Sequence, residues 1–330
     1  MSEPTHARPR VFNLVGAGRS GTSAMTRGLG ALGIDLGDHL KPPGRKNAKG
    51  FFEDRDILDI NYRLHDLLDL RRNGSSLRLL DHPLSAPGAP ELRREAVETL
   101  TRRFGDTPLW GFKCIGVMRL LPFWEAVLDD LGVDVHYVVA IRNPMNVAAS
   151  RKKTDYFRGF QEKSDLEWLV HVVPHFEQVR QRPYCVVDYD RLMANPDREL
   201  RRIAAAHALP VTNEREQGIR AYAEEFLSDK LRHNRADDDE QAARQVNALT
   251  WRAYCHLRAL ARDEAADPAA WDDIADSLRM MAPALLHIDR LEDELRGQFF
   301  GLNSAIQTLK ARFIGARPNT ADKSVVQTHV

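Results

Sequence analysis

The sequence predicts an α/β fold in which a central parallel sheet is flanked by helices, with a helical extension at the C-terminus. Three apolar runs, at residues 11–15, 109–115 and 133–141, are typical of buried strands. Each run is followed by a segment whose apolar residues recur at helical spacing. Strands that alternate with helices favour a parallel sheet. From about residue 237 onward the pattern is helical alone.

The composition predicts a globular protein with a real core. The chain has 330 residues, of which 43% are hydrophobic and 28% charged, enough for one large domain or a domain with an appendage. Lys+Arg and Asp+Glu both number 47, so we expect no nucleic-acid surface, and any anion site must be local. We find no apolar run near the ~18 residues that span a bilayer and no signal-peptide core. We therefore expect a cytoplasmic protein without a membrane segment. Three widely spaced cysteines predict neither a disulfide framework nor a metal site.

The first strand leads into a loop of small residues that suits an anion. Glycines allow a tight turn and bring backbone N–H groups close to a ligand, and the following helix adds the positive end of its dipole. One cation and three hydroxyl groups lie in the same loop. We interpret it as a cradle for a phosphate or sulfate group, formed by Gly18, Arg19, Ser20, Gly21, Thr22 and Ser23.

Two other phosphate-binding motifs fit this loop in part. Gly16, Gly18 and Gly21 match the G-x-G-x-x-G pattern of dinucleotide-binding folds. Asp35 lies near the expected position of the ribose-binding acid, but the strand that should end in this acid is barely present. A nucleotide P-loop requires Gly-Lys-Ser/Thr, and the lysine is missing. Two alternatives are considered for the whole chain: a small-molecule kinase that uses ATP and magnesium, or a non-catalytic nucleotide-binding scaffold.

An acidic cluster follows the cradle. It consists of Glu53, Asp54 and Asp56, between a basic loop at residues 37–50 and a helical pattern. Acids at a helix start are favoured by the helix dipole, which is one interpretation of all three. The other is a general base, because an acid directly after an anion cradle lies where a donor and an acceptor would meet. Lys113, in the second apolar run, either meets a buried anion or lies at the exposed end of its strand.

A second anion site is predicted after the strand at residues 133–141. Arg142 follows this strand directly, Asn143 is a good N-cap, and Pro144 suits a first helical turn. In a parallel sheet, ligands bind at the carboxyl ends of the strands. Ser150 lies about two turns further along the same helix.

The two anion sites together resemble those of PAPS-dependent sulfotransferases. Residues 18–23 resemble the loop that holds the 5′-phosphate of the sulfate donor PAPS, and residues 138–150 resemble the signature that holds its 3′-phosphate. The resemblance implies that Arg19 steadies the departing oxygen, where many relatives have a lysine. It also implies that Arg142 and Ser150 hold the 3′-phosphate.

Further segments extend the resemblance to about residues 10–235. Residues 50–54 (GFFED) resemble bacterial carbohydrate-type members, which implies Glu53 as the general base, with His39, Asp54 and His65 as the other candidates. Residues 226–233 resemble a basic segment that closes the donor site, which implies a contact from Arg232. The family moves a sulfuryl group from PAPS to an acceptor hydroxyl, leaving PAP, and needs no metal. The acceptor implied is a sugar or glycan.

The C-terminal region, residues 236–316, is predicted to be a helical extension, and residues 317–330 a disordered tail. Its last helix has a 3.5-residue apolar repeat, interrupted only by Glu292, which is typical of a coiled coil. The repeat predicts either a homodimer seam or a helix packed on its own domain. Its members are Leu285, Ile288, Leu295, Phe299, Leu302, Ile306, Leu309 and Phe313.

Overall fold

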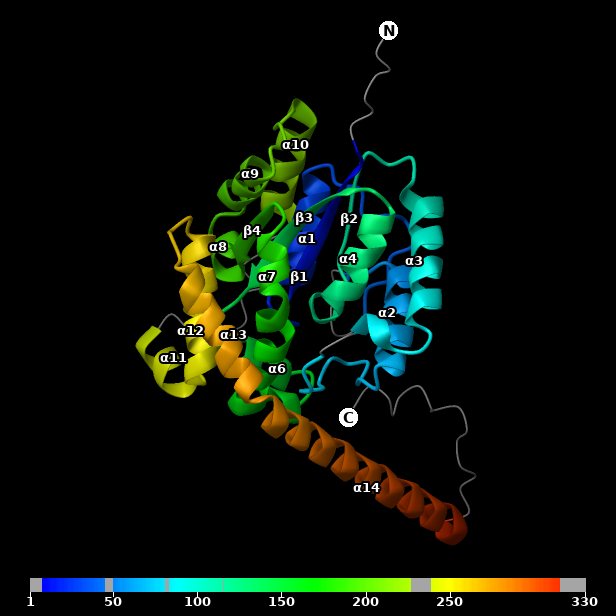
Figure 1. The fold of residues 1–330 in the computed structure, drawn as a ribbon. Helices are drawn as coiled ribbons and strands as arrows, with labels where there is room; N and C mark the ends of the chain where they lie inside the picture. The colour runs from blue at the N-terminus through cyan, green and yellow to red at the C-terminus, as the bar shows by residue number, and fades with distance from the viewer. Residues whose placement is uncertain (1–7, 45–49, 81–82, 115, 227–238, 315–330) are drawn as a thin grey trace.

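A computed structural model describes residues 8–44, 50–80, 83–114, 116–226 and 239–314 of the chain. Its centre is a four-stranded parallel sheet in the order β2-β1-β3-β4 (Figure 1). The strands are β1 (Arg10–Gly16), β2 (Leu109–Phe112), β3 (Asp134–Ile141) and β4 (Tyr184–Asp188). The predicted parallel α/β fold is confirmed.

Helices cover both faces of the sheet (Figure 1). In the first half of the chain they are α1 (Thr22–Ala31), α2 (Arg55–Leu67), α3 (Ala89–Phe104), α4 (Leu121–Asp130), α5 (Pro144–Lys152), α6 (Gln161–Val172) and α7 (Phe176–Arg180). In the second half they are α8 (Tyr189–Ala194), α9 (Pro196–Ala206), α10 (Asn213–Ala221), α11 (Asp239–Gln245), α12 (Ala248–Ala261), α13 (Pro268–Met280) and α14 (Ala282–Ile314). None of these described helices combines the length and apolar character needed to cross a membrane.

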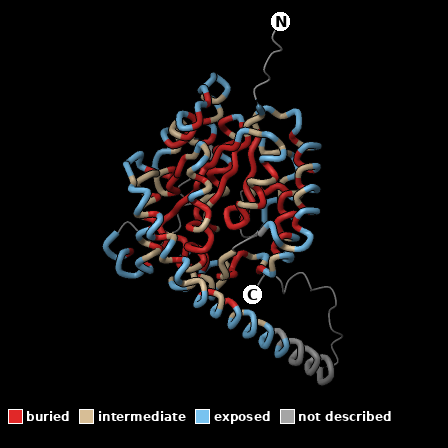
Figure 2. Tube along the Cα trace, viewed as in Figure 1, coloured by how far each residue is buried: buried red, intermediate tan, exposed pale blue. Residues whose placement is uncertain are grey.

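The alternation of side chains along β1 divides the core into two layers. Val11 and Val15 belong to the larger cluster, with residues of α2, α3, α4, α6 and α12. Phe12 and Leu14 belong to the other cluster, with residues of α1, α8, α9 and α10. Figure 2 shows the buried strands between these two helical layers. Because both faces are covered, the strands are mostly apolar, with buried polar residues such as Asn13 and His136 as exceptions, as expected for a parallel sheet.

The region after residue 236 contributes to the larger core cluster. Tyr254 on α12 is buried and donates a hydrogen bond to Asp188 at the end of β4 (3.2 Å). Trp271 on α13 is also fully buried. By contrast, α14 extends away from the rest of the molecule beyond its first turns (Figure 1). Helices α12 and α13 therefore pack on the domain, and α14 is the part that projects.

Within the part of the chain that the structure describes, the strand that the dinucleotide alternative requires before Asp35 is missing. In the described residues, Asp35 forms only an isolated parallel bridge with Trp110, and β1 has β2 and β3 as its neighbours. No strand ending in Asp35 is present in this part of the chain. The acid that a dinucleotide fold would use is therefore not carried by the expected second strand.

Candidate functional site

The loop after β1 has a backbone that only a few residue types accept. Gly16 has φ +140°, and a Cβ atom there would lie 2.4 Å from the carbonyl oxygen of Ala140 on β3. Gly21 has φ +81°, and its Cβ would lie 2.0 Å from the ring of Tyr189. Both positions therefore require glycine. Arg19 also has a positive φ of 75°, a strained conformation that clusters at functional sites.

The start of α1 lies next to this strained loop. Its N-cap is Gly21, which provides no side-chain hydrogen bond to the first turn. Backbone N–H groups at such an end remain available to an anion. Thr22 and Ser23 are partly exposed, whereas the Ser20 hydroxyl is enclosed and has no hydrogen-bond partner among the described atoms. The loop and the start of α1 therefore lie where the cradle is predicted, but Ser20 does not present its hydroxyl at the surface.

The structure brings the two predicted anion sites together. Arg19 Nε donates a hydrogen bond to Ser150 Oγ, at 3.0 Å, across 131 positions of sequence. Arg142 is buried, and its guanidinium carbon lies 4.5 Å from the centre of the Tyr189 ring. Because Tyr189 also contacts Gly21, one aromatic ring lies against the cradle and under Arg142. We call residues 18–23, Arg142 and Ser150 the anion grip.

The anion grip is electropositive. Although Arg19 is exposed as a residue, desolvation of its guanidinium lowers the pKa of Arg19, and the charges of Arg142 and Arg158 lower it further. Among the residues that the structure describes, no carboxylate contacts Arg19. Repulsion between neighbouring cations is relieved when an anion binds between them. This arrangement suits a ligand with at least two negative groups.

Glu53 lies beside the anion grip in a buried ion pair. Its exposed fraction is 5% and that of Lys113 is 6%. Lys113 Nζ lies 3.1 Å from Glu53 Oε1 and donates to the carbonyl oxygen of Phe51 at 2.9 Å. Lys41 Nζ lies 3.7 Å from the other oxygen of Glu53. We call Glu53, Lys113 and Lys41 the acid pocket. Lys113 follows the last residue of β2, so it lies at a strand end and also meets a buried anion.

One backbone carbonyl connects the acid pocket to the anion grip. Ser23 Oγ donates to the carbonyl oxygen of Phe51 at 3.3 Å, and Lys113 Nζ donates to the same atom. Phe51 is two residues before Glu53. The Phe51 carbonyl oxygen therefore accepts hydrogen bonds from Ser23 of the cradle and from Lys113, and Lys113 in turn pairs with Glu53.

The other acids of the cluster have structural partners. Asp54 caps α2, accepting hydrogen bonds from the backbone N–H groups of Asp56 and Ile57 (3.0 and 3.2 Å). Arg103 forms ion pairs with both Asp54 and Asp56. Asp54 and Asp56 therefore act at the start of α2, as one of the two interpretations predicts. Glu53 is the acid of the cluster without that role.

The two histidine candidates lie in different environments. His39 is half-exposed and lies 3.2 Å from an oxygen of Asp56. His65 is buried, its Nδ1 lies 2.6 Å from the carbonyl oxygen of Asn61, and burial lowers the pKa of His65. Among the described residues, neither histidine is connected to the anion grip in the way that Glu53 is, through Lys113 and the Phe51 carbonyl oxygen that Ser23 also contacts. Arg232 lies outside the described residues.

Sequence reasoning missed two features of the site. Tyr189 is the first residue of α8, directly after β4, and a position after a parallel strand is the only signal that points to it. Behind the grip, Glu167 is fully buried and forms ion pairs with Arg151 (3.2 Å) and Arg158 (2.7 Å). Both arginines therefore have a carboxylate partner in the described part of the chain, whereas Arg19 has none there. No group of three metal-ligating side chains occurs in the described part of the chain.

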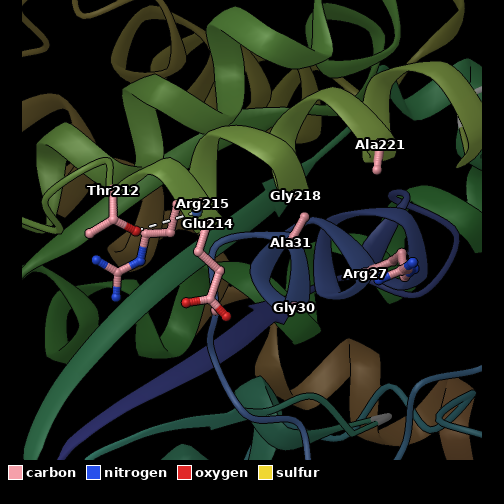
Figure 3. Close-up of a pocket in the computed structure, with 9 residues that line it drawn as sticks. Arg27, Gly30, Ala31, Thr212, Glu214, Arg215, Gly218 and Ala221 are labelled. Carbon is pink, nitrogen blue, oxygen red and sulfur yellow. Dashed lines mark hydrogen bonds between the residues drawn. The ribbon is translucent and has the colours of Figure 1, made fainter.

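A separate open cavity of about 410 Å³ lies between α1 and α10 (Figure 3). Its lining includes Arg27, Gly30 and Gly33 near the end of α1, and Glu214 and Arg215 on α10. Arg215 is already engaged with the carbonyl oxygens of Leu32 (2.8 Å) and Pro210 (2.6 Å). The cavity is at the opposite end of α1 from the cradle and is not part of the candidate site.

Comparisons with known proteins give one family. The chain is similar to the sulfotransferase domain of the Synechococcus PCC 7002 olefin synthase (14% identity, 84% of this chain and 98% of that chain, TM-score 0.40). It is also similar to sulfotransferase STF1 of Mycobacterium tuberculosis H37Rv (16%, 66% and 72%, TM-score 0.37) and to STF9 of Mycobacterium avium (15%, 69% and 70%, TM-score 0.40). No curated protein matches the sequence. The model of the sulfotransferase family matches residues 9–213, which include the anion grip and the acid pocket, and the chain belongs to that family.

Proposed function

We propose that this sulfotransferase takes the sulfuryl group from PAPS and transfers it to a hydroxyl group of a sugar or glycan, leaving PAP. The observation that carries the proposal is the 3.0 Å hydrogen bond from Arg19 to Ser150. It joins a cradle at the end of β1 to the helix after β3. A ligand with phosphate groups on the 5′ and 3′ oxygens of one ribose requires two anion sites that lie close together. PAPS has such groups at its 5′ and 3′ positions.

In this proposal the anion grip holds the donor at two points. The first-turn amides of α1, with Thr22 and Ser23, bind the 5′-phosphosulfate, and Arg19 stabilises the charge that develops on the departing phosphate oxygen. Arg142 and Ser150 bind the 3′-phosphate. Tyr189 supports the grip by fixing Arg142 from below.

Glu53 is the proposed general base. The acceptor oxygen attacks sulfur in line, an O–S bond forms, and the S–O bond to the 5′-phosphate breaks. The proton of the acceptor hydroxyl passes to the Glu53 carboxylate, and PAP leaves with the electron pair of the broken bond. Like phosphoryl transfer, this reaction depends mainly on positioning and on charge stabilisation. The ion pair with Lys113 supports the proposal because it places the carboxylate next to the cradle, through the Phe51 carbonyl oxygen that both Lys113 and Ser23 contact.

The sugar acceptor rests on the resemblance of residues 50–54 to carbohydrate-type members and on the site's position beside the basic loop that carries Lys41. A screen of acceptors with labelled PAPS tests it directly, with free sugars, glycan precursors and small phenolic compounds as separate groups. Transfer to sugar hydroxyls supports the assignment. Transfer to phenols alone contradicts the acceptor while leaving the reaction type intact.

Calorimetry tests the donor. We expect PAP to bind without magnesium and more tightly than ATP or NAD. Arg142→Ala removes a charged hydrogen-bond donor, worth about 1.5–3 kcal/mol, so PAP should bind roughly 10 to 150 times more weakly. The affinity for adenosine 5′-monophosphate, which lacks the 3′-phosphate, should change little.

The control for this experiment is Arg94→Ala, which removes an exposed arginine on α3. It should leave all affinities unchanged. Equal losses of PAP and adenosine 5′-monophosphate in Arg142→Ala would remove the 3′-phosphate assignment. Magnesium-dependent preference for ATP would favour the kinase alternative instead.

A further inference from the structure

Helix α14 has a base that is fixed to its own domain. Leu285 is 1% exposed and Asp289 is 5% exposed. Asp289 accepts a hydrogen bond from the backbone N–H of Leu77 at 2.7 Å and forms an ion pair with Arg71. Glu292 forms ion pairs with Lys163 (2.6 Å) and with Arg71 (2.8 Å). The first three turns of α14 are therefore anchored on α6 and on the segment after α2.

The helix beyond this base has a different surface. We call residues 294–314 the arm. Three of its apolar side chains are largely exposed: Leu295 (64%), Phe299 (51%) and Leu302 (59%). Figure 2 shows the exposed residues along the projecting part of the helix. Large apolar side chains that share one face and lack cover mark an interaction site.

The apolar face of the arm has the period of a coiled coil. The three exposed side chains follow one another at spacings of four and three residues, and the sequence continues this repeat to Ile306, Leu309 and Phe313. Glu292, the only polar residue of the repeat, belongs to the base, where it binds Lys163. Gly297 and Gly301 fall off the repeat, and a Cβ atom at either would meet no other atom. Neither Glu292 nor the two glycines therefore interrupts the apolar repeat along the arm.

An isolated helix of this kind is unstable in water without a partner. Two glycines each cost about 1 kcal/mol relative to alanine, and helices outside a domain depend on packing. The 33 residues of α14 span about 50 Å, and the repeat from Leu295 to Phe313 supplies roughly three heptads. This length suits a two-stranded coiled coil.

The residues that flank the seam are compatible with a second copy of the same helix in one orientation. On one side, the sequence places Gln298, Ala305 and Arg312, and on the other side Arg296, Asn303 and Lys310. In a parallel pair of identical helices, each side of one helix meets the opposite side of the other. Gln298 would then face Asn303 and Ala305 would face Lys310, and neither pair brings like charges together. In an antiparallel pair, Arg296 of one helix would face Lys310 of the other.

We infer that the arm is a dimerisation element, and that it pairs with the arm of a second copy of this chain as a parallel coiled coil. The interface is symmetric, so the apolar face of Leu295, Phe299 and Leu302 packs against the same face of the second copy. The ion pairs of the base fix the direction in which each arm leaves its domain. The inference concerns assembly and does not depend on the proposed function.

Light scattering after size exclusion tests the dimer. The full chain should have twice the single-chain mass of 37.4 kDa. Leu295→Glu places a charge in the seam and should reduce the mass to that of one chain. Arg290→Glu is the matched control, because it introduces the same side chain at an exposed position outside the repeat and should leave the dimer intact. A monomeric full chain, or a dimer that survives Leu295→Glu, would overturn the inference.

A cysteine cross-link tests the orientation. In a parallel pair, residue 302 of each arm faces its counterpart, so Leu302→Cys should form a disulfide-linked dimer under mild oxidation. The unmodified chain, treated with the same oxidant, controls for its own three cysteines. Circular dichroism confirms that each variant is folded. A dimer by light scattering that fails to cross-link through residue 302 would rule out the parallel seam.

Discussion

The anion grip and the acid pocket lie side by side but hold their charges in opposite ways. In the grip, Arg19 is held by the hydroxyl of Ser150, and Arg142 lies over the ring of Tyr189. In the acid pocket, Glu53 and Lys113 face each other as a buried ion pair. In the described residues, Glu53 thus has a charged partner in Lys113, with Lys41 3.7 Å from its other oxygen, whereas Arg19 contacts a neutral hydroxyl. Under the proposed function, an anionic ligand completes the grip.

A third group of residues sharpens this contrast. Arg151 and Arg158 are close neighbours of the grip, yet both form ion pairs with Glu167. Their chemistry is the same as that of Arg19, but they share a buried carboxylate as their partner. Position relative to a buried carboxylate, rather than residue type, separates a candidate ligand-binding arginine from a structural one.

Replacing Glu53 should give the largest effect on the reaction. Glu53→Gln keeps the shape of the side chain but removes the proton acceptor. A general base contributes roughly 10²–10⁴ in rate, so turnover should fall by about that factor while the affinity for PAP is retained. Initial rates with saturating PAPS, together with calorimetry for PAP, measure the two quantities.

The matched control is Glu98→Gln, an exposed acid on α3, which should leave turnover unchanged. Near-normal turnover in Glu53→Gln would move the role of the base to His39 or His65. A parallel loss of PAP affinity would show instead that Glu53 belongs functionally to the grip.

Lys113→Met should mainly affect folding stability. Methionine is similar in length but leaves the Glu53 carboxylate buried without its lysine, and breaking such a pair costs about 3–5 kcal/mol in the free energy of unfolding. In the double variant Lys113→Met/Glu53→Gln no buried charge is left without a partner, because Lys41 is about one third exposed to solvent, so much of the loss should be recovered. Urea unfolding of the wild type, both single variants and the double variant measures the coupling. Strictly additive losses would mean that the two groups do not stabilise each other.

The sequence predicted the sheet well because the parallel strands are buried on both faces. Residues 11–15 and 133–141 are largely apolar for that reason, with Asn13, Asp134 and His136 as exceptions, and each run leads into a cation at the same edge of the sheet. The meeting of Arg19 with Ser150 follows from this topology. Glu53 could be proposed, but its pairing with Lys113 could not, since nothing local shows which side chains share a cavity.

The remaining features depend on contacts across long distances in the sequence. Tyr189 joins the two halves of the grip through packing against Gly21 and Arg142, and no motif encodes that contact. The C-terminal repeat predicted either a homodimer seam or a helix packed on its own domain. In the structure, two parts of α14 differ in this respect. The turns around Asp289 pack on the domain, while the exposed face at Leu295 is the part for which dimerisation is proposed.

Glu167 gives the smallest expected effect and the clearest pH dependence. Burial alone would raise the pKa of Glu167, but the charges of Arg151, Arg158 and Lys163 outweigh this and lower it to about 2, from 4.5 in the unfolded chain. Since the folded state holds the ionised form more tightly, this stabilisation is present above pH 4.5 and is lost as the pH falls toward 2. The shift corresponds to about 3 kcal/mol at neutral pH.

Comparison of the wild type with Glu167→Gln isolates this contribution from the other groups that titrate in acid, including the buried His171 and His175, whose pKa values are also lowered. Urea unfolding from pH 7 down to the lowest pH at which both proteins are folded should show a difference of about 3 kcal/mol that shrinks once the pH falls below 4.5. Glu162→Gln, on the exposed side of the same helix, should track the wild type throughout. A difference that stays constant with pH would mean that Glu167 acts by packing rather than by charge. The arginines behind the grip would then be positioned without the charge pairing that distinguishes them from Arg19.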